Sequence, residues 1–297
     1  MTLYNLAEKN VRKTWFLVIT FLVLIIALGW VFAWFFQEPT ILIVAVIFSI
    51  LTSLGGYWYS DKLVLGLAEA KEIAENDNPE LYRIVENLCI TAGLPAPKIY
   101  IINEEQPNAF ATGRNKDHAV VAVTSGLLKK LEKSELEGVI AHELSHIKNK
   151  DMLLQTIIVV LVGIVAIASN MFLRLSFYGG GRNRDSKASP ILQVLALVAV
   201  VLAPIAANLI KLAISRKREF LADASGALIT RYPEGLASAL EKIASDPNPM
   251  RRANNATAHL YISNPFRGKQ AKSWITKLYS THPPIEERIK ALRGMKV

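Results

Sequence analysis

Four long apolar stretches without a charged residue decide what this chain can fold into. They are residues 14–37, 39–60, 152–173 and 188–210, and each contains 22 to 24 residues. A helix of that length crosses about 30 Å of hydrocarbon. Helices buried in the core of a water-soluble domain do not explain such long runs without charge. The sequence therefore predicts a polytopic membrane protein.

The charges beside these stretches predict their orientation. Lys9, Arg12 and Lys13 precede the first stretch, whereas the short turn after it carries only Glu38. Because basic residues are retained on the cytoplasmic side, we expect a cytoplasmic N-terminus and a hairpin that returns the chain to the cytoplasm. The net charge of +9 then reflects membrane topology. The expected partner is the lipid bilayer, and nucleic-acid binding is not expected.

The second apolar pair gives a conflicting signal. Its connecting loop, residues 174–187, carries four basic side chains and one acidic side chain. If both stretches span the bilayer, this basic loop lies outside, against the positive-inside rule. Two arrangements stay open, namely two full spans or a pair that only partly enters the bilayer.

A metal-binding motif, H-E-x-x-H, lies just before the third apolar stretch at His142, Glu143 and His146. Residues four apart share one face of a helix, so both imidazoles can bind one ion. Zinc suits the site, because a catalytic zinc takes three protein ligands and keeps a position for water. The carboxylate of Glu143 can then act as a general base. The sequence therefore predicts a zinc site with an adjacent base.

The helix that carries the motif is expected to begin at a capping box formed by Ser134 and Glu137. It is expected to continue unbroken into the third apolar stretch. At 1.5 Å per residue, His146 would then lie about 9 Å along the axis from Met152, where the apolar stretch begins. The metal is therefore expected at the membrane surface.

The remaining segments predict a soluble α+β part. Asn78 and Pro79 are typical of a helix start, and Gly93 of its end. Apolar runs at 98–102 and 118–123 predict strands of a small sheet with an exposed edge. Further helices are expected at residues 233–244, 271–279 and 284–293.

The two histidines supply only two of the three protein ligands that a catalytic zinc takes. Glu219 and Asp223 lie four apart on a predicted helix, so one carboxylate can bind the metal while the other holds a ligand histidine. The same residues also fit an exposed helix face with ordinary charge pairs. Glu219 is best placed, because its helix would emerge from the second apolar pair at the membrane surface. The candidate third ligands are His118, His259, His282, Glu219, Asp223 and Asp151.

The ordered set of motifs resembles the HtpX-type membrane zinc metallopeptidases, relatives of the CAAX prenyl endopeptidases. The likeness covers essentially the whole chain. It comprises two N-terminal spans, NAFATG at 108–113, HELSH at 142–146, a hydrophobic pair, EFLAD at 219–223 and THPP at 281–284.

This resemblance implies a mainly α membrane protein with four hydrophobic helices and an α+β zincin-like metallopeptidase domain. The implied divisions are an N-terminal transmembrane hairpin (1–60), the first half of a cytoplasmic peptidase domain (61–151), a second hydrophobic hairpin (152–210) and the second half of the peptidase domain (211–297).

The resemblance also implies residue roles. His142, His146 and Glu219 would bind one zinc ion per chain, Glu143 would be the catalytic base, and Asp223 would support a ligand.

Further roles concern the substrate. An extended substrate would lie on the edge strand formed by Asn108, Ala109, Phe110 and Ala111, and His282 is the candidate donor to the oxyanion. The implied activity is cleavage of membrane or misfolded proteins at the cytoplasmic face, in quality control and the stress response.

Two rival functions remain from other classes. One is a catalytically inactive zinc-binding membrane scaffold, which the intact Glu143 disfavours because a structural site needs no base. The other is a transporter, which would carry ionisable residues inside its spans. The four apolar stretches have none.

Overall fold

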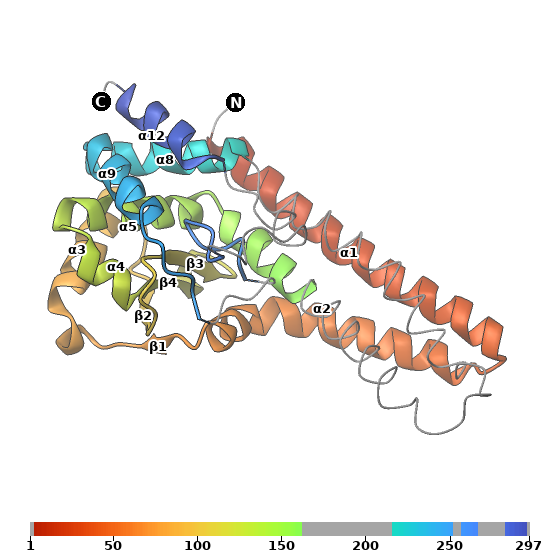
Figure 1. The fold of residues 1–297 in the computed structure, drawn as a ribbon. Helices are drawn as coiled ribbons and strands as arrows, with labels where there is room; N and C mark the ends of the chain where they lie inside the picture. The colour runs from red at the N-terminus through yellow and green to blue at the C-terminus, as the bar shows by residue number, and fades with distance from the viewer. Residues whose placement is uncertain (1–2, 162–215, 252–256, 267–282, 296–297) are drawn as a thin grey trace.

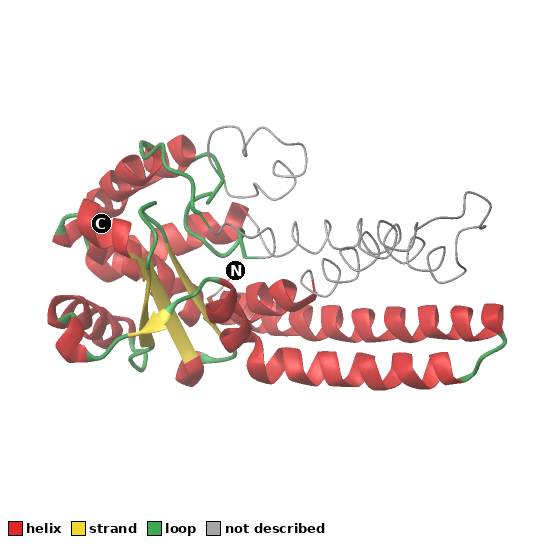
Figure 2. Cartoon of the chain, turned by 60° about the horizontal axis from the view of Figure 1, so that its bottom comes forward, coloured by secondary structure: helices red, strands yellow, loops and turns green. Residues whose placement is uncertain are grey.

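A helical hairpin projects from an α/β body in the computed structural model, which describes residues 3–161, 216–251, 257–266 and 283–295 (Figures 1 and 2). The helices and strands are α1 (Leu3–Phe36), α2 (Thr40–Leu67), β1 (Lys71–Glu72), η1 (Glu75–Asp77), α3 (Pro79–Ala92), β2 (Lys98–Ile102), β3 (Ala109–Gly113), η2 (Lys116–His118), β4 (Ala119–Thr124), α4 (Ser125–Lys130), α5 (Lys133–Lys148), the apolar helix Asp151–Leu161, α8 (Arg216–Thr230), α9 (Pro233–Ala244) and α12 (Ile285–Arg293).

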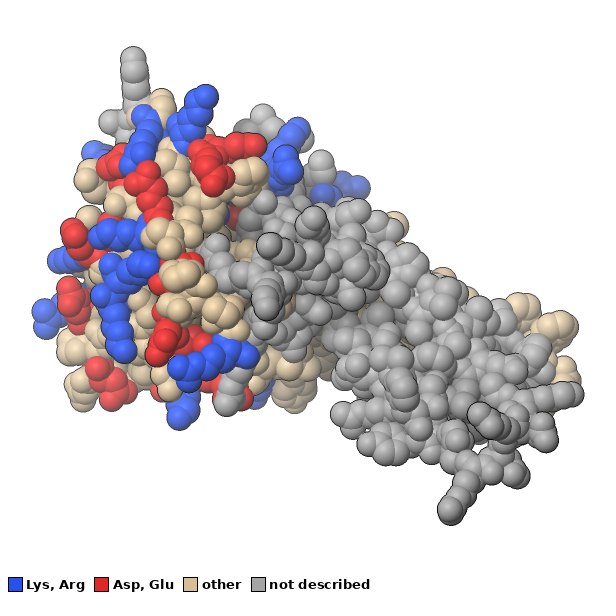
Figure 3. Space-filling model, viewed as in Figure 1, with Lys and Arg blue, Asp and Glu red and all other residues tan. Residues whose placement is uncertain are grey.

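The hairpin consists of α1 and α2, and both are long and apolar enough to cross a membrane. Large apolar side chains face outward from it, among them Phe16 on α1 and Leu51 on α2. Such a surface is typical of contact with lipid. The charged side chains visible in Figure 3 gather instead on the α/β body. The first two predicted spans are thus present as helices.

The third apolar stretch is described only at its start, where residues 151–161 form a buried helix. The rest of that stretch, the fourth stretch and the loop 174–187 lie outside the described residues. The second hydrophobic pair therefore stays a prediction.

A mixed four-stranded sheet, in the order β1-β2-β4-β3, separates two cores. Strands β2 and β4 are parallel, with Lys98 opposite Val120, whereas β3 runs antiparallel to β4. Because side chains alternate along a strand, Ala109 and Ala111 of β3 face the core formed by α3, α5 and α9. Phe110 between them faces the apolar helix Asp151–Leu161 and the base of the hairpin. The sheet therefore joins the hairpin to the helix that carries H-E-x-x-H.

Helix α3 follows the sequence prediction at both ends. The side chain of Asn78 accepts a hydrogen bond from the amide of Leu81 at 3.1 Å, and Pro79 occupies the first helical position. Gly93 ends the helix with a φ of 69°, a conformation that favours glycine. These signals are local, so the sequence alone defines them.

The start of α5 corrects the predicted capping box of Ser134 and Glu137. The cap is Glu132, whose amide donates to Oε2 of Glu135 at 2.8 Å. Lys242 of α9 also contacts this Oε2, at 2.8 Å. The tertiary ion pair with α9 fixes Glu135 at this position, so the box forms two residues earlier than predicted.

The end of α5 corrects the prediction of an unbroken helix. The helix stops at Lys148, and Lys150 has a left-handed φ of 55° before the next helix begins at Asp151. In a continuous helix, residues 146 and 151 would lie about 140° apart around the axis. The turn instead brings Oδ2 of Asp151 to 3.2 Å from Nδ1 of His146. The break thus places a carboxylate behind a histidine of the motif.

The C-terminal helices pack on α5. Helix α9 has the predicted bounds 233–244, and α12 begins at Ile285 with Pro284 as its cap. The helix predicted at 271–279 lies outside the described residues. A Cβ atom at Gly226 of α8 would lie 3.0 Å from the amide of His142, and one at Gly138 of α5 would lie 2.7 Å from the amide of Leu236. Glycines therefore allow α8 and α9 to approach α5 closely.

We predict that Gly138→Ala lowers the thermal unfolding temperature of the full chain in detergent. The added methyl group meets the backbone of α9, and such overpacking costs about 1–3 kcal/mol. The matched control is Gly66→Ala in α2, where the new methyl group has no atom within 4 Å apart from the backbone of its own helix and its chain neighbours. Equal unfolding temperatures for the two variants would contradict the close contact between α5 and α9.

Candidate metal centre

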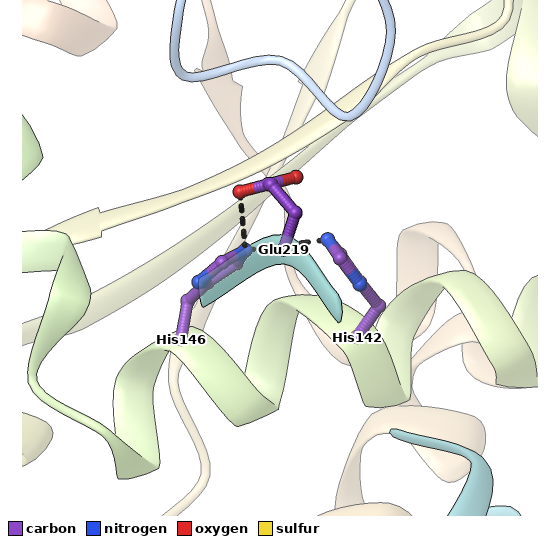
Figure 4. Close-up of side chains that lie close together, drawn as sticks. All are labelled: His142, His146 and Glu219. Carbon is purple, nitrogen blue, oxygen red and sulfur yellow. Dashed lines mark hydrogen bonds and ion pairs between the residues drawn. The ribbon is translucent and has the colours of Figure 1, made fainter. Parts of the chain in front are cut away.

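Two helices bring together three side chains that could hold a metal ion. His142 and His146 project from α5, and Glu219 projects from α8 (Figure 4). Their ligand atoms all lie within 4.8 Å of one another, and all three residues are buried. The two Nε2 atoms are 3.2 Å apart, and Oε1 of Glu219 is 3.7 Å from Nε2 of His146. The motif and the EFLAD segment thus converge in one place.

The geometry fits a zinc ion. Two imidazole nitrogens bound tetrahedrally at 2.0–2.1 Å lie about 3.3 Å apart, close to the observed separation. The Nδ1 atom of each imidazole faces a carboxylate. Nδ1 of His142 lies 2.9 Å from Oδ1 of Asp223, and Nδ1 of His146 lies 3.2 Å from Oδ2 of Asp151. A proton held between Nδ1 and a carboxylate leaves the Nε2 lone pair available to a metal. Both histidines are therefore oriented as ligands.

Arg288 anchors the carboxylate behind His142. Its guanidinium donates two hydrogen bonds to Asp223, at 2.8 and 2.7 Å, and a third to the carbonyl of Ile262 at 3.1 Å. Burial alone would raise the pKa of Asp223, but the charge and hydrogen bonds of Arg288 outweigh it and lower the pKa to about 2. Asp223 therefore stays ionised and can accept the proton of Nδ1.

Asp151 has the corresponding role behind His146. The side chain of Asn10, on α1, donates to Oδ1 of Asp151 at 2.6 Å and to the carbonyl of Asn149 at 3.1 Å. Burial works to lower the pKa of His146, but the Asp151 contact and the charge of Glu219 raise it to about 9. The carboxylates around this imidazole thus create a site that attracts positive charge.

Glu143 of α5 is buried near His146, Glu219 and strand β3. Burial raises the pKa of Glu143 to about 7, although the charge of His146 and the backbone of Ala111 in β3 work to lower the pKa of this carboxyl group. A carboxyl group with a pKa near neutrality can both accept and return a proton, as a general base must.

The edge of β3 is more covered than the sequence predicted. The carbonyl of Ala109 accepts a hydrogen bond from the amide of Ile262 at 3.0 Å, and Phe110 packs edge-to-face on Tyr261 with ring centroids 5.2 Å apart. The side chain of Asn108 is buried and exchanges two hydrogen bonds with the backbone of Ser263. Residues 257–266 therefore lie along the first half of the predicted substrate strand.

The other candidate ligands lie elsewhere. His118 is exposed, with Nδ1 2.8 Å from the side chain of Asn115. His259 is buried, with Nε2 3.2 Å from the carbonyl of Gln155. His282 lies outside the described residues. Asp223 and Asp151 contact the histidines rather than join the cluster.

The exposed-face alternative for Glu219 and Asp223 is wrong, because both side chains are buried. Sequence reasoning missed Arg288 and Asn10. The spacing of Ile285, Arg288 and Leu292 held a signal, since it places an arginine at a core-facing position of a helix.

Residues 75–296 match the profile of Peptidase family M48. The chain belongs to peptidase family M48. Its M48 relatives include proteins called Protease HtpX homolog from Thermoanaerobacter pseudethanolicus, 44% identical over 99% of this chain and 98% of the relative, and from Dictyoglomus turgidum, 47% identical over 99% and 95%. A third, from Thermococcus sibiricus, is 49% identical over 91% and 90%.

The crystal structure of Ste24p from S. mikatae has a similar fold. Its TM-score is 0.50 at 18% identity, and the match covers 97% of this chain and 67% of that chain. M48 peptidases are zinc-dependent, and membership of the family makes this chain a membrane-associated zinc metalloendopeptidase. The resemblance to HtpX-type peptidases is thereby confirmed.

We predict that Arg288→Ala strongly destabilises the fold and lowers zinc content. Removal of the guanidinium leaves Asp223 buried without its partner, which costs about 3–5 kcal/mol. Chemical unfolding and zinc analysis of the purified full chain measure the two effects.

The matched control is Arg293→Ala on the same helix. Arg293 also pairs with two carboxylates, those of Glu234 and Glu241, but it is 44% exposed. Exposed pairs contribute little, so this variant should resemble the unsubstituted chain. Similar losses of stability and zinc in both variants would contradict a special role for the buried pair of Arg288 and Asp223.

Proposed function

We propose that His142, His146 and Glu219 hold one zinc ion and that Glu143 is the base of a peptide hydrolysis. The observation that carries this proposal is the convergence of the three ligand atoms within 4.8 Å beside a buried glutamate. A catalytically inactive scaffold would need the ligands but no buried carboxylate next to them.

The chain's own groups account for the proton transfers. When bound, zinc supplies Lewis-acid polarisation of the scissile carbonyl and acidifies a water molecule. Glu143 takes a proton from the attacking water and returns it to the leaving amine nitrogen. Asp223 and Asp151 hold the two imidazoles in the orientation that ligation requires. His282 remains our proposed donor to the oxyanion.

The proposed substrate site is the edge of β3 that β4 does not use. The carbonyl of Ala109 faces this edge, because it accepts a hydrogen bond from Ile262, and Ala111, two residues along the strand, presents its amide on the same side. Since N–H and C=O groups alternate along a strand, the carbonyl of Ala111 and the amide of Gly113 share the edge. An extended peptide bonded there would pass beside the base. The amide of Ile262 already bonds the carbonyl of Ala109. The half of the edge from Ala111 to Gly113 is therefore the better fit for a substrate peptide.

The proposed orientation places the metal centre at the cytoplasmic face. Asn10, near the N-terminal end of α1, bonds Asp151 behind His146, so that end of the hairpin lies beside the metal centre. The basic residues Lys9, Arg12 and Lys13 mark the same end as cytoplasmic. We propose that a peptidase unit built from residues 61–151 and 211–297 cleaves membrane or misfolded proteins there, in quality control.

We predict that Glu143→Gln retains zinc but loses casein cleavage by at least about 100-fold, because it removes the base and keeps the ligands. Glu219→Ala should lose zinc as well as activity. Zinc content and casein cleavage of both purified variants test the roles. Activity of Glu143→Gln within a few-fold of the unsubstituted chain would refute the base, and unchanged zinc in Glu219→Ala would refute the third ligand.

The orientation is tested with single cysteines in a Cys89→Ala background. A cysteine at Glu38, in the exposed turn of the hairpin, should react with a membrane-impermeant thiol reagent in intact cells. A cysteine at Lys217, exposed next to the metal centre, should react only after lysis. Labelling of both positions from the same side would overturn the proposed topology.

A further inference from the structure

A basic pocket lies where the hairpin meets the α/β body. Residues of α1 and α2, the turn around η2, and the junction between α5 and the helix Asp151–Leu161 line it, and its volume is about 320 Å³. Arg114, Lys116, Lys148 and Lys150 contribute cations to the wall, and Trp15 and Tyr57 contribute aromatic rings. Asp117 also lines it. We call this cavity the interfacial pocket.

Aromatic side chains fix the level of the interfacial pocket relative to a bilayer. Trp15 is 48% exposed at the body end of α1, and Trp34 is 68% exposed near the other end. Their separation of 19 positions in the sequence corresponds to about 28 Å of helix, close to the roughly 30 Å of a hydrocarbon core. Tryptophan and tyrosine prefer the interface, and Trp58 and Tyr59 of α2 are exposed at the body end too. The pocket therefore opens at the headgroup level of the adjacent leaflet.

The cations of the pocket are available to a ligand. Lys116, Lys148 and Lys150 are exposed, and none of the three forms an ion pair with another described residue. The guanidinium of Arg114 lies 4.7 Å from the ring centroid of Trp58 and is thereby held at the aromatic level. The rings of Trp15 and Tyr57 stack with centroids 5.7 Å apart. Donors for phosphate oxygens thus lie next to apolar surface.

We propose that the interfacial pocket binds the headgroup phosphate of an anionic phospholipid. The four cations and one carboxylate of its wall give a formal charge of +3 (4 − 1), which favours an anionic ligand. Phosphate oxygens bind arginine and lysine through strong charge-assisted hydrogen bonds, and basic pockets beside transmembrane helices suit lipid headgroups. A free phosphate would use the cations alone, whereas a lipid also covers the rings of Trp15 and Tyr57.

The interfacial pocket is separate from the catalytic machinery. None of its lining residues is a proposed zinc ligand or the proposed base. Binding can therefore be measured without reference to peptidase activity, and the result does not depend on the proposed mechanism.

The test uses the full chain in detergent micelles and follows the thermal unfolding temperature as a probe is added. The probes are dioctanoyl phosphatidylglycerol, dioctanoyl phosphatidylcholine with the same chains but a zwitterionic headgroup, and glycerol 3-phosphate without chains. We expect a saturable increase with phosphatidylglycerol, because a ligand that binds only the folded state stabilises it. An equal response to phosphatidylcholine would overturn charge recognition, and an equal response to glycerol 3-phosphate would make this a free-anion site.

The pocket is then assigned with charge-matched variants. Lys116→Gln/Lys148→Gln removes two pocket cations and should weaken the apparent affinity for phosphatidylglycerol roughly 25-fold, at about fivefold for each basic group. Lys129→Gln/Lys133→Gln removes two exposed cations elsewhere and should bind as the unsubstituted chain does. Lys148→Arg keeps the charge and should keep the affinity. Equal weakening in both double variants, or none in the pocket variant, would overturn the proposal.

Discussion

The burial of charge around two facing imidazoles is the constraint on which the rest of the structure depends. Beside His142 and His146 lie four buried carboxylates and two buried guanidiniums, namely Glu143, Asp151, Glu219, Asp223, Arg218 and Arg288. With neutral histidines their formal charge is −2 (−4 + 2), which a bound divalent cation would offset. Because each unpaired buried ion costs several kcal/mol, α5, α8 and α12 must be held in the one arrangement that pairs these groups.

Local signals in the sequence predicted the elements well. The H-E-x-x-H spacing predicted which face of α5 carries both imidazoles, and Asn78 with Gly93 defined both ends of α3. These two signals depend only on neighbours in the chain, and the folded structure keeps both. The spacing of Glu219 and Asp223 was also informative, although the sequence alone could not decide whether that helix face was buried or exposed.

Contacts between distant segments were beyond sequence reasoning. The pair between Glu135 and Lys242 moved the start of α5, and the turn at Lys150 broke the helix that the sequence predicted to be continuous. Arg288 lies 65 residues from Asp223, and no spacing rule connects them. In each case a tertiary interaction overrode or completed a local preference.

One hydrogen bond gives the hairpin a structural role beyond anchoring the chain in a membrane. Asn10 of α1 supports Asp151 behind His146, and Phe21 and Val64 of the two membrane helices pack in the core beneath β3. A chain cut at the end of α2 would lose that support and expose that core to water. Proteolytic release from the membrane would therefore remove the support of His146 instead of setting free an intact peptidase part.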